Sequence, residues 1–324
     1  MKNILIRADS SSRMGSGHIM RCIILAKGLK EVDSDVTVFF ASQDLESNVN
    51  YKIIEASCVL CDLQSNSIEE LLSLCEELDI TLLIVDSYDI DYDDEEKIVK
   101  NTKSMVLFFD DIFREHCCDM VVNHGMHVKR EMYNGLLAHN TKLFCGSSTT
   151  LLRDEFFNVY NNPVKNNNIA IILGGNDVLN LSAKIASLLL EIDKTFNIVI
   201  LTMSSNKNIE YLQKLERVGL LLDVDNVAEV LSAQKVVICG SGGVLFEVMS
   251  LNKKFINICI ADNQQGIVDY LEQKDIKTSI GIDELSRSNF KSKLDYIIKV
   301  DIYEKLELKF SGNKLAEDIL KGML

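Results

Sequence analysis

The sequence predicts an α/β protein of two doubly wound, Rossmann-like domains. Short apolar runs alternate with amphipathic stretches in both halves of the 324-residue chain. This alternation is typical of strands and helices that form parallel sheets covered on both faces. The chain is also long enough for two hydrophobic cores. The only proline, Pro163, lies in a polar, asparagine-rich stretch at 161–168 between the two halves, which we interpret as a linker.

The expected elements follow from the apolar periodicity of each segment. In the first half, strands are expected at 4–6, 36–40, 81–85, 105–109 and 120–122, and helices at 19–30, 68–78 and 95–101. In the second half, strands are expected at 169–173, 198–201, 236–238 and 255–258, and helices at 181–192, 208–218, 244–250 and 266–273. We therefore expect one domain at 1–160, a second at 169–301, and a C-terminal helix at 302–324 that can pack back on the first domain.

Composition excludes several classes of protein. The formal net charge is −14 and there is no run of Lys or Arg, which disfavours nucleic acid and anionic membranes as partners. Nine scattered cysteines and no signal-peptide pattern indicate reduced thiols in the cytoplasm. No apolar stretch has the length of a membrane span. We expect a cytoplasmic protein; the sequence leaves its oligomeric state open and is compatible with a monomer.

The stretch IRADSSSRMGSGHIMR at 6–21 is the most informative part of the chain. An apolar strand enters a loop of small residues, and the loop ends at His18, where a helix begins. Gly15 and Gly17 let the backbone approach a ligand closely. A helix N-terminus attracts anions and favours the neutral form of a nearby imidazole. The stretch favours a loop that binds a phosphorylated substrate next to a histidine base. The alternative is a turn without a ligand, in which the histidine only caps the helix.

The whole string DSSSRMGSGHIMR resembles the N-terminal signature of the UDP-2,4-diacetamido-2,4,6-trideoxy-β-L-altropyranose hydrolases, enzymes of pseudaminic acid biosynthesis. Two α/β domains that face a cleft also form the GT-B architecture of nucleotide-sugar enzymes. The resemblance implies a metal-independent hydrolase without a cofactor, in which His18 is the base that activates water and the anomeric carbon is inverted. The substrate contacts expected from this stretch are Asp9, Ser12, Gly15, Gly17 and Arg21.

Two glycine-containing loops follow expected strands in the second half. Their residues are Gly174, Gly175 and Asn176 after strand 169–173, and Ser241, Gly242 and Gly243 after strand 236–238. Backbone N–H groups exposed at such loops hold phosphates, although the first loop alone is equally compatible with a ligand-free turn. Glu247 lies one helical turn beyond the second loop, where a carboxylate can accept hydrogen bonds from ribose hydroxyls. The alternative for Glu247 is a solvent-facing helix residue.

Two further motifs resemble those of the same family. The residues ADNQ at 261–264 match a family motif residue for residue, which implies that Asn263 belongs to the active site and that Gln264 binds sugar or phosphate. The sequence Asp86-Ser87-Tyr88 is similar to a family D-x-Y motif. We expect Tyr88 to hydrogen-bond the sugar or the water beside His18, while Asp86 can equally be a structural anchor.

The remaining polar clusters have structural alternatives. Asp110 and Asp111 end strand 105–109 and are interpreted as helix caps. Arg153, in a segment similar to the family's LLR-x-EF, orients a carboxylate or the domains, or forms a surface ion pair. The residues His116, Cys117, Cys118, His124 and His127 suggest zinc, but their spacing matches no common ligand pair and adjacent cysteines ligate one ion poorly. We therefore expect no metal.

Together with the residues above, the resemblance implies hydrolysis of a UDP-linked diacetamido sugar to UDP and the free sugar. Two alternatives remain: a GT-B glycosyltransferase, in which the same base would deprotonate a sugar hydroxyl, and a non-catalytic nucleotide-sugar-binding protein. The acidic chain has no basic or lipid-binding patch for a lipid acceptor, which disfavours the first. The presence of both His18 and Asn263 disfavours the second.

Overall fold

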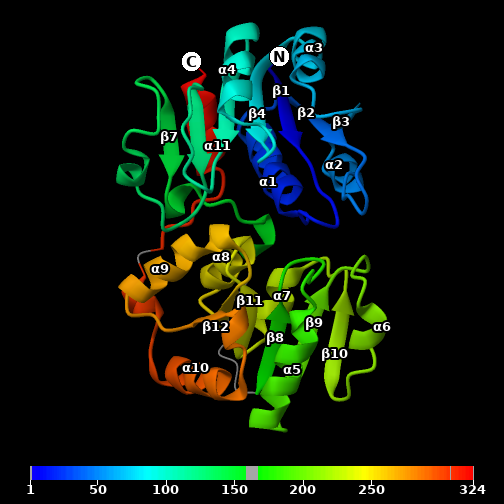
Figure 1. Ribbon diagram of the computed structural model, residues 1–324, viewed down its shortest axis with the longest axis vertical. Coiled ribbons are helices and arrows are strands. Elements are labelled where there is room, and N and C mark those ends of the chain that lie inside the picture. The colour runs from blue at the N-terminus through cyan, green and yellow to red at the C-terminus, as the bar shows by residue number, and fades with distance from the viewer. Residues whose placement is uncertain (1, 158–166, 307, 324) are drawn as a thin grey trace. The chain divides into compact units, whose positions relative to one another are not determined.

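Both halves of the chain form parallel sheets with helices on both faces in the computed structural model (Figure 1). The structure describes residues 2–157, 167–306 and 308–323. The chain divides into unit 1, Met1–Leu151 with Lys309–Leu324, and unit 2, Leu152–Leu308. The prediction of two doubly wound α/β domains is confirmed.

Unit 1 contains a seven-stranded parallel sheet with strand order β3-β2-β1-β4-β5-β6-β7. The strands are β1 (Lys2–Ala8), β2 (Val36–Gln43), β3 (Val59–Leu63), β4 (Ile80–Asp86), β5 (Met105–Phe109), β6 (Met120–Asn123) and β7 (Lys142–Cys145). The helices are α1 (Gly17–Val32), α2 (Tyr51–Glu55), α3 (Ile68–Glu77), α4 (Tyr92–Asn101) and α11 (Lys314–Gly322). The strand order reverses between β1 and β4, and ligands of such sheets bind at the carboxyl ends of the strands at this switch point.

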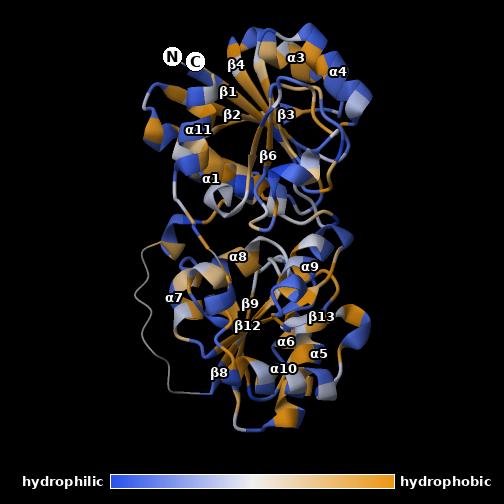
Figure 2. Ribbon diagram, turned by 90° about the vertical axis from the view of Figure 1, so that its left-hand side faces the viewer, coloured by the Kyte–Doolittle hydropathy of each residue, from blue (hydrophilic) through white to orange (hydrophobic). Residues whose placement is uncertain are grey.

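Alternating residues of the central strands are buried on opposite faces of this sheet. Leu5 and Leu83 belong to a cluster with Leu71 of α3 and Ile98 of α4. Ile4, on the other face of β1, is equally buried, and α1 covers that side. Burial on both faces requires continuous apolar strands, which is what the sequence shows. Figure 2 shows the apolar residues gathered along the strands.

Helix α11 belongs to unit 1 although it ends the chain (Figure 1). The Nδ2 of Asn313 donates a hydrogen bond to Oε2 of Glu31 on α1, at 2.7 Å. A Cβ at Gly28 would lie 3.3 Å from the Cβ of Ala316, so a glycine in α1 allows close packing of α11. The stretch 302–324, expected to be one helix, instead contains a 3₁₀ turn at Tyr303–Lys305 and the shorter α11.

Unit 2 contains a six-stranded parallel sheet with strand order β10-β9-β8-β11-β12-β13. The strands are β8 (Asn168–Ile172), β9 (Asn197–Thr202), β10 (Val218–Leu222), β11 (Val236–Gly240), β12 (Lys254–Cys259) and β13 (Ser279–Gly281). The helices are α5 (Leu181–Ile192), α6 (Ile209–Leu212), α7 (Val227–Ser232), α8 (Gly243–Ser250), α9 (Gln265–Gln273) and α10 (Arg287–Lys299). The switch point lies between β8 and β11, the two strands that the predicted glycine loops follow.

Some boundaries differ from the sequence-based expectation. The helix expected at 208–218 is only Ile209–Leu212, because the chain then enters the edge strand β10. Residues 152–157, expected in the first domain, belong to unit 2. The predicted linker at 161–168 lies largely outside the described residues, which resume at residue 167.

Candidate active site

The loop after β1 forms a tight turn that ends where α1 begins. Ser11 and Gly15 exchange two backbone hydrogen bonds, with Gly15 N to Ser11 O at 2.9 Å. Gly15 has φ +76°, a left-handed conformation that favours glycine. His18 is the second residue of α1, and no side chain caps this helix N-terminus. The turn therefore presents His18 at the carboxyl end of β1, beside the switch point.

His18 forms a hydrogen-bonded pair with Asp86, the last residue of β4. His18 Nδ1 lies 2.6 Å from Asp86 Oδ1, and the side chains are 13% and 1% exposed. An ionised carboxylate can only accept a hydrogen bond, so Nδ1 carries the proton and Nε2 of the neutral imidazole is the acceptor. Nε2 makes no hydrogen bond within the described part of the chain. With Nδ1 paired to Asp86, Nε2 is the ring nitrogen of His18 that can accept a proton.

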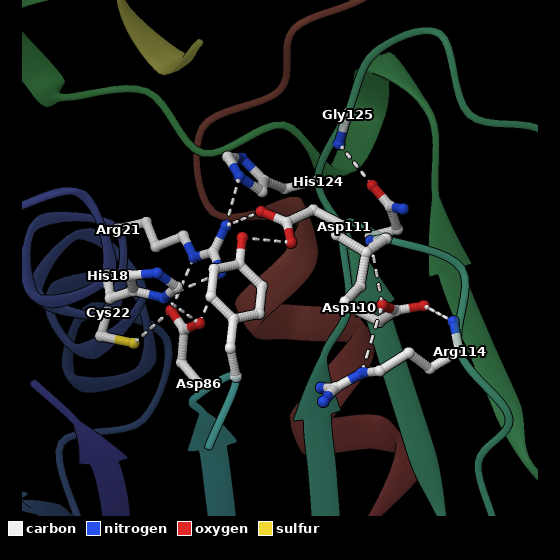
Figure 3. Close-up of polar contacts among 12 residues, drawn as sticks. His18, Arg21, Cys22, Asp86, Asp110, Asp111, Arg114, His124 and Gly125 are labelled. Carbon is white, nitrogen blue, oxygen red and sulfur yellow. Dashed lines mark hydrogen bonds and ion pairs between the residues drawn. The ribbon is translucent and has the colours of Figure 1, made fainter. Parts of the chain in front are cut away.

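Arg21 lies one turn after His18 on α1 and organises the neighbouring acids (Figure 3). Its Nε donates to Asp86 Oδ2 at 2.6 Å, and its Nη2 donates to Asp86 Oδ1. Nη1 lies 3.1 Å from Asp111 Oδ2. Burial of Asp86 opposes its ionisation, but the charge of Arg21 and the hydrogen bonds outweigh this effect and hold the pKa of Asp86 far below its usual range. Asp86 is therefore a carboxylate whenever the fold is intact near neutral pH.

Tyr88 and His124 complete the cluster in unit 1. The Tyr88 ring stands edge-on to His18, with ring centroids 4.9 Å apart and an interplanar angle of 87°. Tyr88 Oη donates to Asp111 Oδ1 at 2.6 Å, and a phenol oxygen that donates in this way can also accept a hydrogen bond. Burial and the charge of Arg21 lower the pKa of His124 to about 4, which keeps this imidazole neutral beside Arg21 Nη1 at 3.2 Å. The cluster therefore contains one guanidinium, two carboxylates and two imidazoles.

Two residues expected to bind substrate form internal ion pairs. Asp9 is 5% exposed, pairs with Arg7 at 2.5 Å and accepts a hydrogen bond from Gln43 N at 2.8 Å. Arg21 donates to Asp86 and Asp111, as described above. Both side chains therefore support the loops of the site, and a direct contact with substrate stays a prediction. Ser12 and Gly17 remain at least partly exposed in the β1–α1 turn.

The carboxylates that end β5 have different surroundings. Asp110 is buried and accepts hydrogen bonds from the backbone N of Ile112 and Arg114, each at 3.1 Å, and from the Tyr133 hydroxyl at 2.8 Å. These contacts fit the structural interpretation of Asp110. Asp111, interpreted in the same way from the sequence, instead bridges Arg21 and Tyr88.

The histidine–cysteine segment forms a buried hydrogen-bonded cluster. Ligand atoms of Glu95, His116 and Cys118 all lie within 4.8 Å of one another. Glu95 accepts from the backbone N of Cys117 and Cys118 at 2.7 and 2.8 Å, and its Oε2 lies 2.7 Å from His116 Nδ1. The Sγ of Cys118 donates to Met120 O at 3.2 Å. These polar groups are used to hold the turn before β6.

In unit 2, the loop after β8 is shaped by Gly174, which has φ +82°. Gly175 O accepts hydrogen bonds from Thr202 Oγ1 and Met203 N, both at 2.8 Å, and Asn176 Oδ1 accepts from Ser205 Oγ at 2.7 Å. The carbonyl of Gly175 thus points toward the β9 side of the loop. The loop lies at the carboxyl end of β8, at the switch point of this sheet.

The three residues predicted to bind phosphate in the loop after β11, Ser241, Gly242 and Gly243, differ in their exposure. Ser241 is 2% exposed; its backbone N donates to Ile258 O at 2.9 Å, and its Oγ accepts from Asn257 Nδ2 at 2.9 Å. Ser241 therefore supports the loop from beneath. Gly243 is exposed as the first residue of α8, and a Cβ there would meet nothing within 4 Å. Gly242 and Gly243 are thus the residues of this loop that remain at least partly exposed, and anion binding by their backbone stays a prediction.

Gln264 and Asn263 lie in the 3₁₀ turn Asp262–Gln264 after β12. Gln264 Oε1 accepts a hydrogen bond from Ile260 N at 3.0 Å, and its Nε2 would lie 3.5 Å from a Cβ placed on Gly242. The structure therefore brings Gln264 beside the glycine loop. Asn263 is exposed at the tip of the turn.

Glu247 on α8 pairs with Arg153, which the sequence interpretation left without a partner. Arg153 Nε donates to Glu247 Oε1 at 2.7 Å, and Nη2 donates to Oε2 at 2.9 Å. Glu247 is 8% exposed, so the solvent-facing alternative for this residue is wrong. Its predicted contact with ribose stays a prediction.

Comparison with known proteins identifies the family of this chain. No family model matches the chain. The UDP-2,4-diacetamido-2,4,6-trideoxy-β-L-altropyranose hydrolase of Campylobacter jejuni is 36% identical over 276 residues, which span 84% of this chain and 96% of that protein. The chain belongs to this hydrolase family. The resemblance seen in the N-terminal signature is confirmed.

Solved structures support the fold of this family member. MurG of Acinetobacter baumannii has a TM-score of 0.66 at 12% identity, covering 99% of both chains. The glycotransferase of kitacinnamycin has a TM-score of 0.70 at 12% identity, covering 100% of this chain and 99% of its own. These likenesses confirm the GT-B type of two Rossmann-like domains. Among the described residues, no helix combines the length and apolar character that crossing a membrane requires.

Sequence reasoning singled out His18 in this hydrolase family member but did not place two carboxylates of the cluster around it. The role of Asp86 was left undecided between the site and a structural anchor, and Asp111 was interpreted as a helix cap. A signal was present, because both residues end parallel strands next to the switch point, where side chains gather.

Proposed function

We propose that the protein hydrolyses a UDP-linked 2,4-diacetamido-2,4,6-trideoxy sugar to UDP and the free sugar. The observation that carries this proposal is the His18–Asp86 pair, which leaves Nε2 of His18 as an acceptor in a member of a UDP-sugar hydrolase family. From the resemblance of the N-terminal signature, we also propose that the product is used in pseudaminic acid biosynthesis.

In the proposed reaction, a water molecule attacks C1 of the sugar from the face opposite the diphosphate. The water proton passes to His18 Nε2, the C1–O bond breaks, and UDP leaves with the bonding electron pair. Attack from the opposite face inverts the anomeric carbon. UDP is a good leaving group once its charge is stabilised, so a single general base suffices. Tyr88 and Asn263 are proposed to contact the sugar or the attacking water.

The diphosphate is proposed to bind to backbone N–H groups of unit 2. Gly242 and Gly243 lead into α8, where the helix dipole favours an anion, and Gly174 opens the neighbouring loop. Gln264, whose Nε2 lies beside Gly242, is proposed to contribute a side-chain donor. N–H groups that are already oriented can stabilise the developing charge on the leaving group.

A coupled assay of UDP release, run across a panel of UDP-diacetamido sugars with and without a sugar acceptor, tests this function. Hydrolysis predicts UDP release without an acceptor, together with free sugar of inverted configuration. Release that requires an acceptor would instead indicate a glycosyltransferase. Binding of the UDP-sugar without turnover would indicate a nucleotide-sugar-binding protein.

Activity is expected to survive excess EDTA, because the proposal assigns the phosphate charge to N–H groups. The measurement is the rate of UDP release before and after chelation and dialysis. Loss of activity that Mg²⁺ or Zn²⁺ restores would contradict the amide-based mechanism.

Replacing Glu247 with alanine is expected to weaken UDP binding by about 1–3 kcal/mol, the range for a lost hydrogen bond to a charged group. The physical reason is loss of the acceptor proposed for the ribose hydroxyls. Isothermal titration calorimetry with UDP measures the change, and Glu247→Gln, which keeps one acceptor oxygen, should lose less. Unchanged UDP affinity in Glu247→Ala would leave Glu247 only as the partner of Arg153.

A further inference from the structure

Arg153 is held in one orientation by its surroundings in unit 2. Its guanidinium carbon lies 5.0 Å from the centroid of the Phe156 ring. Its Nη1 lies 3.3 Å from Glu155 Oε1, and this same oxygen accepts a hydrogen bond from Val227 N at the start of α7, at 3.0 Å. The guanidinium therefore packs against an aromatic ring on one side and an anchored carboxylate on another.

This orientation defines the plane of the Glu247 carboxylate. The two parallel hydrogen bonds from Nε and Nη2 reach different oxygens of Glu247, and such a bidentate pair fixes both distance and plane. Arg153 is the sole hydrogen-bonding partner of this carboxylate within the described ranges. Each carboxylate oxygen has two lone pairs, so each keeps one further acceptor position.

Two acceptor positions on adjacent oxygens match two donors on adjacent carbons, as in the 2′- and 3′-hydroxyls of a ribose. Glu247 lies one turn beyond Gly243 on α8, so a nucleotide whose diphosphate binds at the glycines has its ribose within reach of α8. A glutamate without a partner samples several rotamers and loses this entropy on binding. Its bidentate partner removes that cost before the nucleotide arrives.

We propose that Arg153 is a positioning residue that makes the nucleotide site selective for ribose over 2′-deoxyribose. Arg153 acts through Glu247: it orients the carboxylate so that each oxygen can accept a hydrogen bond from one of the two ribose hydroxyls. This inference rests on the proposed binding of a uridine diphosphate by unit 2.

The test compares dissociation constants of UDP and 2′-deoxyuridine 5′-diphosphate by calorimetry for the wild type, Arg153→Met and Arg153→Lys. The wild type should prefer UDP by about tenfold, as expected for one hydrogen bond to a charged group. In Arg153→Met, the dissociation constant for UDP should rise about tenfold, and the dissociation constant for 2′-deoxyuridine 5′-diphosphate should rise much less. The ratio of the two constants should therefore approach one. Lysine keeps the charge but not the bidentate geometry, so Arg153→Lys should also lose most of the preference.

A matched control is Lys305→Met, which removes a cation from an exposed ion pair of the same unit, Lys305 Nζ to Asp275 Oδ2 at 2.9 Å. This variant should keep the full preference for UDP. If the wild type prefers UDP and Arg153→Met keeps that preference, Arg153 is only structural and the proposed nucleotide site stands. If Arg153→Met does not fold, retention of the preference by Arg153→Lys overturns the proposal in the same way. If the wild type binds UDP but does not distinguish the two nucleotides, the ribose contact of Glu247 and this proposal both fail, while UDP-sugar hydrolysis is judged by the release assay.

Discussion

Replacing His18 with asparagine or alanine is expected to lower kcat by roughly 10²–10⁴-fold or more, the range that a general base contributes. Asparagine retains a hydrogen-bonding side chain but has no nitrogen that accepts a proton, so it should be nearly as impaired as alanine. The affinity for UDP should stay close to that of the wild type, because the nucleotide is proposed to bind to unit 2. Steady-state UDP release and calorimetry with UDP measure the two quantities separately.

The pH dependence gives a second readout for His18. A protonated imidazole cannot accept a proton from water, so kcat of the wild type should fall at acid pH. The residual activity of His18→Asn should lack this acid limb. Turnover of either variant within a few-fold of the wild type would show that His18 only begins the helix.

Replacing Asp86 with asparagine is expected to lower kcat by about 10³–10⁴-fold, on the order of the loss seen when a histidine base is held in the wrong tautomer. The amide can donate to Nδ1 of His18, which moves the imidazole proton to Nε2 and removes the acceptor. The substitution also leaves the buried Arg21 without one carboxylate. Loss of one partner of a buried ion pair costs roughly 3–5 kcal/mol of unfolding free energy.

Glu95→Gln is the matched control for Asp86→Asn. Glu95 pairs with His116 Nδ1 at 2.7 Å, in a buried carboxylate–imidazole contact of the same kind within unit 1. This variant should lower the melting temperature while kcat per folded molecule stays near that of the wild type. If Asp86→Asn behaves in the same way, with lower stability and unchanged kcat, then Asp86 is a structural anchor and His18 does not depend on it.

The central strands of both sheets could be predicted because burial on two faces demands continuous apolar runs. The four strands that the sequence analysis missed, β3, β7, β10 and β13, are the four edges of the two sheets. An edge strand has only one neighbour and is more exposed; β10, for example, has no residue that is fully buried. Only its first residue, Val218, was assigned to an element, as the end of the helix expected at 208–218.

The sequence alone determined the α/β class, the two-domain organisation and the position of His18. These follow from local information: apolar period, glycines in one loop, and a family signature contained in about a dozen consecutive residues. Tertiary structure decided which groups face His18 and Glu247. Asp86 is 68 residues from His18, Asp111 is 90 residues from Arg21, and Arg153 is 94 residues from Glu247. The first two contacts arise because parallel strands bring their carboxyl ends to one edge of a sheet, and strand order, which no single segment encodes, selects the strands that become neighbours. The third joins helix α8 to a segment that precedes β8 in the chain.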